Sequence, residues 1–343
     1  MKKSVLFIAI VFSISIAKAQ LKPYYAQYVL NNYILNPAVT GIENYVDVKI
    51  GYRNQWSGIE GAPVTYYATV HGPIGKKGNR PTATSFDMQG SNPYKSKELE
   101  LDEPETAHHG IGFTAISDKT GYITRTTFAA SYAYHIPVSL HASIAAGFMA
   151  GATNVFLDKS KIVWANLDPN DPAVGVNNGE IMRTKFEMGA GVWFYGRNFF
   201  IGSSVLNIVP GKISLVESEK YGESNKPHLF AQAGYKFQLS NDLSILPSAA
   251  ILQISPFPTF VQLVSKLQYR DVLWIGGGYS FKDELSGNVF MAGMNIAHTI
   301  NIGYSYSATS DQKLSAYTGN THELVIGFLL GNKYGDSCPK NLW

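Results

Sequence analysis

Cysteine and charge are both scarce in this chain. Cys338 is the single cysteine among 343 residues, which excludes a fold held together by disulfide bonds. Charged residues make up 15% of the sequence, whereas an ordinary soluble domain has roughly 25%. No basic surplus is clustered in one region, so the composition argues against a nucleic-acid-binding protein.

Long apolar runs are missing beyond the first residues. No later segment approaches the roughly 20 apolar residues that a membrane-spanning helix needs. The richest run, residues 192–210, is interrupted by Gly196, Arg197 and Gly202. If the protein crosses a membrane, we therefore expect it to cross as a β-barrel.

The N-terminus has the pattern of a secretory signal peptide. Lys2 and Lys3 precede the apolar residues 4–16, and Ala17, Lys18 and Ala19 form an A-x-A site. This pattern predicts cleavage after Ala19. Without the three lysines of this peptide, the 28 basic residues fall to the same number as the 25 acidic ones. The mature protein is thus expected to be exported and formally neutral, and no charge-steered partner is implied.

Apolar residues recur with a period of two. From Val46 to Arg53 every second residue is apolar, and the residues between them are polar or glycine. The same alternation occurs over residues 127–136, 186–195 and 301–308. One apolar face with this period indicates β-strands. We count about fourteen such runs, which start near residues 45, 63, 109, 122, 142, 184, 199, 228, 243, 259, 272, 288, 301 and 321.

The connections between these runs alternate in length. Short turns follow the even-numbered strands from the fourth onward, while long polar links, residues 158–183 and 210–227, follow the fifth and seventh. Short periplasmic turns with longer outer loops are typical of outer-membrane barrels. We therefore predict an all-β fold, a transmembrane antiparallel β-barrel of about 14 strands. The alternative is a soluble β-sandwich or periplasmic barrel, but its polar face would carry many Lys and Glu, whereas here that face is mostly small and uncharged.

Two further features bear on the barrel. Residues 73–107 form a long link where a short turn is due, and we expect a mobile insertion there. Aromatic residues near strand ends on the apolar face predict the girdles that lie at the two headgroup levels. These are Tyr45, Tyr52, Tyr134, Phe194, Phe199, Phe237, Tyr269, Tyr279, Phe281 and Phe328.

The segment before the first strand, residues 20–44, is rich in Tyr, Leu and Ile. Such a cluster would be a liability if it were exposed. The residues expected to face the barrel interior include many glycines, which permit close approach by another backbone. We therefore hypothesise that this segment enters the barrel as a plug or caps its periplasmic mouth; the alternative is a flexible tail.

Signals of catalysis or cofactor binding are weak. None of the eight histidines has the spacing of a metal site, and no nucleophile or phosphate-loop motif is present. His108 and His109 are adjacent, so their rings should lie on opposite faces of a strand as structural residues. Residues 168–172 read Asp-Pro-Asn-Asp-Pro, which could bind Ca²⁺ but more often forms turns. We predict no catalytic residue, no cofactor, no metal and no enzyme activity.

The link between the first two strands is the densest unusual stretch. It contains Arg53, Gln55, Trp56, Gly58, Gly61 and Pro63. The glycines allow positive φ and the proline stiffens the return. Trp56 in a loop is either packed on its own barrel in a rigid turn or part of a partner-binding rim.

These motifs, taken in order, resemble the PorP/SprF family of outer-membrane proteins associated with type IX secretion. The matching pieces are Gln27-Tyr28, Asn31, Asn36-Pro37-Ala38 with Gly41, the loop from Arg53 to Pro63, His71-Gly72-Pro73, Ser117-Asp118-Lys119 within residues 112–121, and residues 131–134. The insertion at residues 73–107 departs from the family pattern. The resemblance implies a non-enzymatic outer-membrane component of the secretion or gliding machinery, with outer-membrane lipid, machinery components and cargo or adhesin proteins as partners.

The predicted organisation follows from these observations. Residues 1–19 form the signal peptide, 20–44 the possible plug, 45–331 the barrel and 332–343 a periplasmic tail. The leading function is binding or assisting export of partner proteins at the outer membrane, or linking the machinery to that membrane; the alternative is a passive channel or small-molecule transporter. The candidate partner-binding or plug residues are Asn36, Pro37, Ala38, Arg53, Gln55, Trp56, Gly58, Gly61, Pro63 and Trp343.

Overall fold

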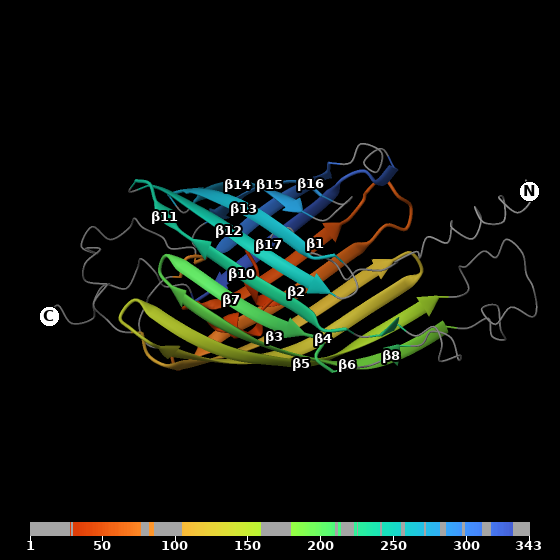
Figure 1. Cartoon of the computed structure of the whole chain (residues 1–343), viewed down its shortest axis with the longest axis horizontal. Coiled ribbons are helices and arrows are strands. Elements are labelled where there is room, and N and C mark those ends of the chain that lie inside the picture. Colours follow the sequence, from red (N-terminus) through yellow and green to blue (C-terminus); the bar gives the residue numbers. More distant parts are fainter. Residues whose placement is uncertain are drawn as a thin grey trace, which may run out of the picture.

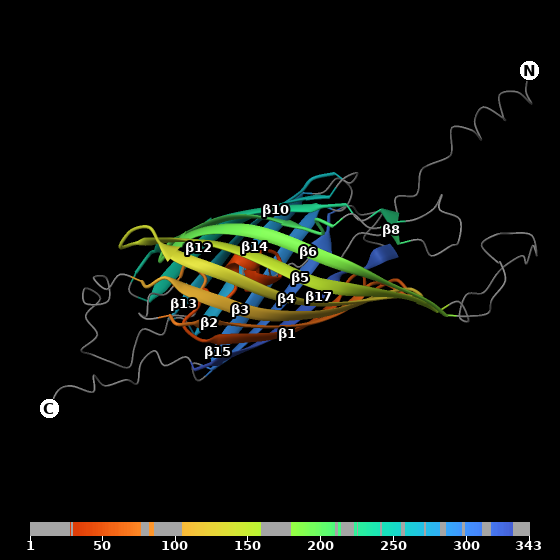
Figure 2. The same cartoon turned by 90° about the horizontal axis from the view of Figure 1, so that it is seen from below.

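Fourteen antiparallel strands close on themselves to form the wall of a barrel (Figures 1 and 2). The computed structural model describes residues 28, 30–76, 82–85, 105–158, 180–209, 212–213, 223–224, 226–240, 242–254, 258–270, 272–281, 286–296, 299–310 and 317–331. The first seven wall strands are β1 (Val46–Asn54), β2 (Val64–Ile74), β3 (His108–Thr120), β4 (Ile123–Pro137), β5 (Ala142–Asp158), β6 (Glu180–Gly196) and β7 (Phe199–Leu206). The other seven are β10 (His228–Tyr235), β12 (Leu243–Ile254), β13 (Phe260–Tyr269), β14 (Leu273–Phe281), β15 (Gly287–Ile296), β16 (Ile300–Thr309) and β17 (Thr321–Leu330).

Two pairings turn the sheet into a closed barrel. Each wall strand pairs with the next wall strand, so that β10 pairs with both β7 and β12, and β1 also pairs with β17. The short strand β11 (Phe237–Gln238) continues the β10 edge onto β12, and β8 (Lys212–Ile213) and β9 (Glu223–Ser224) form a separate two-stranded ribbon. The predicted number of wall strands is confirmed, and their starts agree closely except that β6 begins at Glu180 rather than near residue 184.

The predicted faces are also confirmed. In β1, Asp47, Lys49 and Arg53 are at most 4% exposed, whereas Ile50 is 53% exposed. In β6, Phe186 is 75% exposed while Glu187, the next residue, is buried. Apolar side chains therefore cover the outside of the barrel, which is the arrangement that a lipid environment requires, and the buried charged and polar residues of the strands lie inside it, beside a buried apolar cluster. No helix among the described residues is long and apolar enough to span a membrane.

One girdle residue was predicted wrongly. Tyr45 is 5% exposed and belongs to the buried cluster inside the barrel. It precedes β1, so the strand's alternation does not fix its direction. The girdle residues Tyr52, Tyr134, Phe237 and Tyr269 are exposed on the outside, as expected.

Candidate functional site

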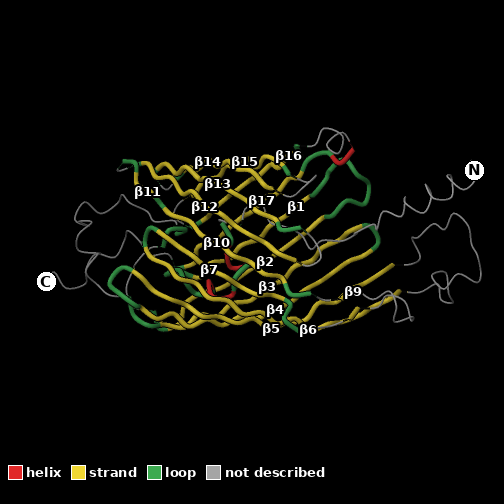
Figure 3. The backbone as a smooth tube through the Cα atoms, viewed as in Figure 1, coloured by secondary structure: helices red, strands yellow, loops and turns green. Residues whose placement is uncertain are grey.

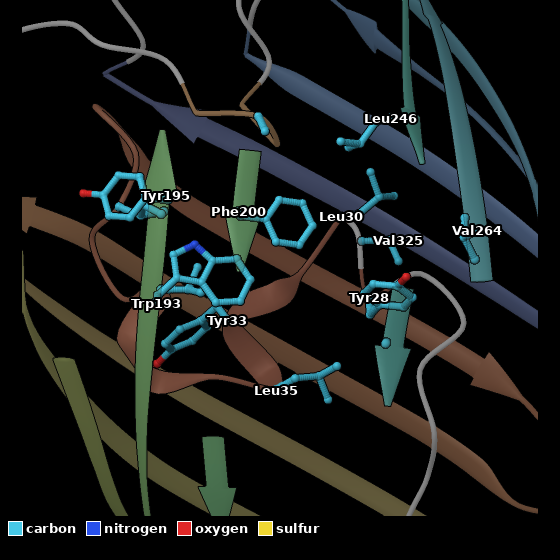
Figure 4. Close-up of a cluster of buried hydrophobic side chains, with 14 of the residues drawn as sticks. Tyr28, Leu30, Tyr33, Leu35, Trp193, Tyr195, Phe200, Leu246, Val264 and Val325 are labelled. Atoms are coloured by element: carbon cyan, nitrogen blue, oxygen red, sulfur yellow. The ribbon is translucent and has the colours of Figure 1, made fainter. Parts of the chain in front are cut away.

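The barrel interior contains a segment of its own chain. Tyr28 and residues 30–45, called here the lumenal segment, precede β1 and are buried almost throughout. The segment forms two short 3-10 helices, η1 (Asn32–Ile34) and η2 (Pro37–Val39), which Figure 3 draws in red. The helix η2 contacts β4, β5 and β6. Figure 4 shows Tyr28, Leu30, Tyr33 and Leu35 of this segment among wall side chains such as Trp193.

Asn36 both starts η2 and ties it to the wall. Its Oδ1 accepts a hydrogen bond from the Ala38 N–H at 2.9 Å, and Pro37 occupies the first turn, where no backbone donor is needed. Its Nδ2 donates to the carbonyl oxygens of Val192 and Ser203, at 3.1 and 3.2 Å. One side chain therefore caps the helix and attaches it to two neighbouring strands, β6 and β7.

Glycines of the wall let the segment approach the backbone of the strands. A Cβ atom added at Gly191 would lie 2.1 Å from Oδ1 of Asn36, and one at Gly147 would lie 2.5 Å from the Pro37 carbonyl oxygen. At Gly110 it would lie 1.9 Å from the carbonyl oxygen of Thr40. All three distances are shorter than any van der Waals contact, so only glycine fits beneath the segment at these positions.

Three wall histidines hold the backbone at Thr40 and Gly41. Nε2 of His135 lies 2.8 Å from the Thr40 carbonyl oxygen and therefore donates to it, and its Nδ1 lies 3.0 Å from the Tyr195 hydroxyl. Nδ1 of His71 accepts the Gly41 N–H at 3.1 Å, and Nε2 of His108 lies 3.2 Å from the Gly41 carbonyl oxygen. The rings of His108 and His135 stack, with centroids 4.4 Å apart. His108 is buried and His109 is exposed, which confirms that the two rings lie on opposite faces of β3.

Polar side chains fasten the rest of the segment to strands around the barrel. The Tyr33 hydroxyl lies 2.7 Å from Oγ of Ser131 on β4, and the Tyr28 hydroxyl lies 3.1 Å from Oγ of Ser248 on β12. Oγ of Ser204 on β7 donates to the Leu35 carbonyl oxygen at 2.5 Å. Burial raises the pKa of Tyr28 to about 12, partly offset by its bond to Ser248, so this hydroxyl stays neutral at any physiological pH.

The predicted insertion packs onto the lumenal segment where it is described. Thr82 and Ser85 donate from Oγ1 and Oγ to the Glu43 carboxylate, at 3.0 and 2.5 Å. Nζ of Lys76 donates to the Ile42 carbonyl oxygen and lies 3.0 Å from Oε1 of Glu105. These residues are buried, so the expectation of a mobile link is wrong for this part; residues 77–81 and 86–104 lie outside the described residues.

Burial raises the pKa of Glu43. The bonds from Ser85 and Thr82 and the charge of Lys76 work against this rise, while the charge of Asp47 adds to it. The carboxyl group therefore favours its neutral form more than an exposed glutamate does.

Arg53 lies inside the barrel, away from η2. Its Nη1 lies 3.3 Å from Oε2 of Glu323 on β17, and Oε1 of the same carboxylate accepts the Tyr67 hydroxyl at 3.1 Å. Nη2 of Arg53 contacts Oε1 of Gln55 at 3.5 Å. Arg53 thus joins β1 and β17 across the pair of strands that closes the barrel.

The rim loop between β1 and β2 is hydrogen-bonded to neighbouring loops, and it contains Trp56, Gly58, Gly61 and Pro63. The Ser57 and Gly58 N–H groups donate to the carbonyl oxygens of Asn320 and Thr318, and the Gly121 N–H donates to that of Gly61. The Gln55 N–H donates to the Pro63 carbonyl oxygen at 2.9 Å, which closes the loop. Trp56 has a φ of 56° and Gly61 one of 75°. The loop backbone is therefore bonded to its own barrel, while residues 58–61 stay exposed and Trp56 is half-buried, so a rigid turn and a partner-binding rim are both compatible with this geometry.

The candidate residues therefore fall into separate groups. Asn36, Pro37 and Ala38 lie in the lumenal segment. Arg53 contacts both Glu323 and Gln55, and the remaining loop residues lie at the rim between β1 and β2. Trp343, the tail after residue 331 and residues 168–172 lie outside the described residues. In the part of the chain that the structure describes, no group of three His, Cys, Asp or Glu could hold a metal ion.

Comparisons with known proteins give one family. The family model described as type IX secretion system membrane protein PorP/SprF matches residues 17–328. No curated protein matches the chain.

Several solved structures resemble the chain at low similarity. Omp33 of Acinetobacter baumannii is 9% identical, with a TM-score of 0.45 over 85% of this chain and 100% of that one. A FadL homologue of Pseudomonas aeruginosa is 11% identical, with a TM-score of 0.44 over 90% and 94% of the two chains. The toluene transporter TbuX of Ralstonia pickettii is 12% identical, with a TM-score of 0.41 over 86% and 92%. No inference about ligands follows from likenesses this distant.

Proposed function

Because the chain belongs to the PorP/SprF family of type IX secretion system membrane proteins, we propose that it is a non-enzymatic outer-membrane component that binds a partner protein of this machinery. The partner is either an exported protein, such as cargo or an adhesin, or a component that the barrel ties to the outer membrane. The protein acts as a docking platform rather than as the conduit.

The lumenal segment is the observation that carries this proposal. It is attached to wall strands from β2 round to β12 through Asn31, Tyr33, Asn36 and Tyr28. A barrel interior occupied in this way leaves little room for an unfolded polypeptide or a large solute to pass. A docking role uses only the surfaces at the rims, so it is compatible with an interior that the lumenal segment occupies.

The rim loop between β1 and β2 supplies a suitable surface. Ile59 is 42% exposed and Trp56 is half-buried beside it. Their backbone is already fixed by the hydrogen bonds to the neighbouring loop at residues 318–320. A rigid surface loses little conformational entropy when a partner binds, which favours affinity.

The test is affinity purification of the full-length protein from gently solubilised outer membranes, followed by mass spectrometry. We expect secretion machinery or its cargo to co-purify, and Ile59→Ser to weaken this recovery. Leu140→Ser is the matched control, because Leu140 is 51% exposed in the turn between β4 and β5, on the opposite rim. Recovery of only abundant unrelated porins would count against the proposal.

Conductance measurements distinguish the docking role from the alternative prediction, a passive channel. We expect the native protein to show low conductance in planar bilayers and a variant lacking residues 20–44 to show a higher one. Large, steady pores from the native protein would favour the channel instead.

A further inference from the structure

The barrel interior contains an apolar pocket beside the lumenal segment. It is a cavity of about 110 Å³ whose floor includes Ile34 and Leu35 of that segment. Its wall includes Ile116, Phe230 and Leu252, which point inward from β3, β10 and β12 and are only half-buried. Phe230 and Leu252 face each other as cross-strand partners. Other apolar wall residues, such as Trp193 and Phe200, are buried against the lumenal segment, whereas the apolar side chains at this pocket are left partly uncovered.

The pocket lies towards the long-loop rim. Most of its wall residues come from the ends of β3, β7 and β12 and from the starts of β4 and β10, all of which meet at that rim, and the rest come from β5 and β6. The histidine cluster that holds Thr40 and Gly41 contributes none of the lining, so the pocket is separate from that cluster, although it adjoins the hydrogen bond between Tyr33 and Ser131.

The polar groups around the pocket are already paired within the wall. The Asp118 carboxylate accepts the Thr65 hydroxyl at 2.8 Å, and Glu187 lies 3.4 Å from Nζ of Lys185. The hydroxyls of Thr127 and Thr153 bond each other at 2.6 Å. Because these groups need no further partner, a bound molecule gains mainly by covering the apolar surface. A charged ligand would lose its hydration without a free counter-charge in return.

We propose that this pocket binds one single-ring aromatic or short branched aliphatic group carrying at most one uncharged polar group. A cavity of about 150 Å³ lined by Leu, Ile and Phe binds benzene, and the volume here is of that order. The group belongs either to a free small molecule or to a side chain of a polypeptide. This inference is independent of the docking role proposed above, because it concerns the interior and not the rims.

The test uses the full-length protein in lipid nanodiscs with 4-fluorobenzyl alcohol as the probe, followed by ¹⁹F NMR. Empty nanodiscs measure partition into lipid. We expect saturable binding above that background, and Leu252→Trp should lower the affinity about tenfold or more because the indole fills the pocket. Ile251→Trp is the matched control, since Ile251 is the preceding residue, is 44% exposed and points to the outside; its affinity should equal that of the native protein.

A second variant keeps the test decisive if Leu252→Trp does not fold. Phe230→Ala enlarges the pocket, and we expect this variant to bind 2-naphthylmethanol and the native protein not to bind it. Competition with N-acetylphenylalanine amide distinguishes the two sources of the bound group, a polypeptide side chain and a free small molecule. Displacement of the probe assigns the pocket to a polypeptide side chain, and no displacement assigns it to a free small molecule. Absence of saturable binding, or equal loss in Ile251→Trp, overturns the proposal.

Discussion

Adding one methyl group at Gly110 should loosen the lumenal segment from the barrel wall. Gly110 lies on the inner face of β3, and the Cβ atom of an alanine there would lie 1.9 Å from the Thr40 carbonyl oxygen and 2.5 Å from its carbon. Both are backbone atoms, so no side-chain rotation relieves the clash. The same oxygen accepts the bond from Nε2 of His135, which must lengthen or break when the segment moves.

The size of the effect follows from these two terms. Overpacking a close-packed site costs roughly 1–3 kcal/mol, and losing a buried hydrogen bond costs a further 0.5–1.5 kcal/mol or so. If about 1 kcal/mol of this cost falls on the attached state, the ratio of detached to attached molecules rises about fivefold, and 3 kcal/mol raises it about 150-fold. The wall itself should persist, because the strand pairings of β3 with β2 and β4 are unchanged.

Gly327→Ala provides the control for this experiment. Gly327 also lies buried on the inner face, in β17, but a Cβ atom there would meet its nearest neighbour, Cβ of Asn301, at 3.4 Å. Single-channel recording should show a higher open probability for Gly110→Ala than for Gly327→Ala. Equal open probabilities and equal thermal stabilities of the two variants would refute the reasoning.

Two further changes probe the charges inside the barrel. Arg53→Ala leaves the Glu323 carboxylate, which is 1% exposed, without its guanidinium partner. We expect the free energy of unfolding, measured with urea in lipid vesicles, to fall by roughly 3–5 kcal/mol. The double variant Arg53→Met, Glu323→Gln should recover most of this loss. An unchanged urea midpoint for Arg53→Ala would contradict this. For Glu43, whose pKa is raised in the folded state, the unfolded chain ionises first, so this residue lowers stability as pH rises above its ordinary pKa of 4.5. Glu43→Gln should therefore flatten the stability profile from about pH 4.5 upward, which unfolding at a series of pH values would reveal; a profile identical to that of the native protein would exclude the effect.

The strands of this fold could be predicted because alternation is a local property. Asp47, Lys49 and Arg53 are separated by apolar residues in the sequence, and a strand must place them on one face. The lipid outside then requires the apolar face to point outward, so the direction follows as well. Tyr45 was missed because it precedes the strand, where the chain is turning and the period no longer applies.

The contacts of the candidate site could not be predicted because they depend on strands far away in the sequence. Asn36 bonds Val192 and Ser203, and Arg53 bonds Glu323. Nothing in the residues around Asn36 distinguishes these partners from other backbone carbonyls. The histidine cluster left a weak signal, since alternation turns both His108 and His135 inward and an antiparallel register can place them opposite each other. Recognising the cluster required the register between β3 and β4, which could not be read from the turn that joins these two strands.

The way the lumenal segment is attached follows from the inverted faces of the barrel. Because lipid takes many of the apolar side chains, the inner wall offers hydroxyls, imidazoles and glycines beside a buried apolar cluster that includes Trp193 and Phe200. The segment is held by packing against that cluster and by hydrogen bonds such as those at Asn36, Tyr33 and Gly41. Each such bond contributes only about 0.5–1.5 kcal/mol net, because water can replace it. Detachment therefore needs water to enter the interior, while the lipid-facing wall and its strand pairings stay intact. We infer that the segment and the wall are separable in stability, so a partner at either rim can shift the segment without unfolding the barrel.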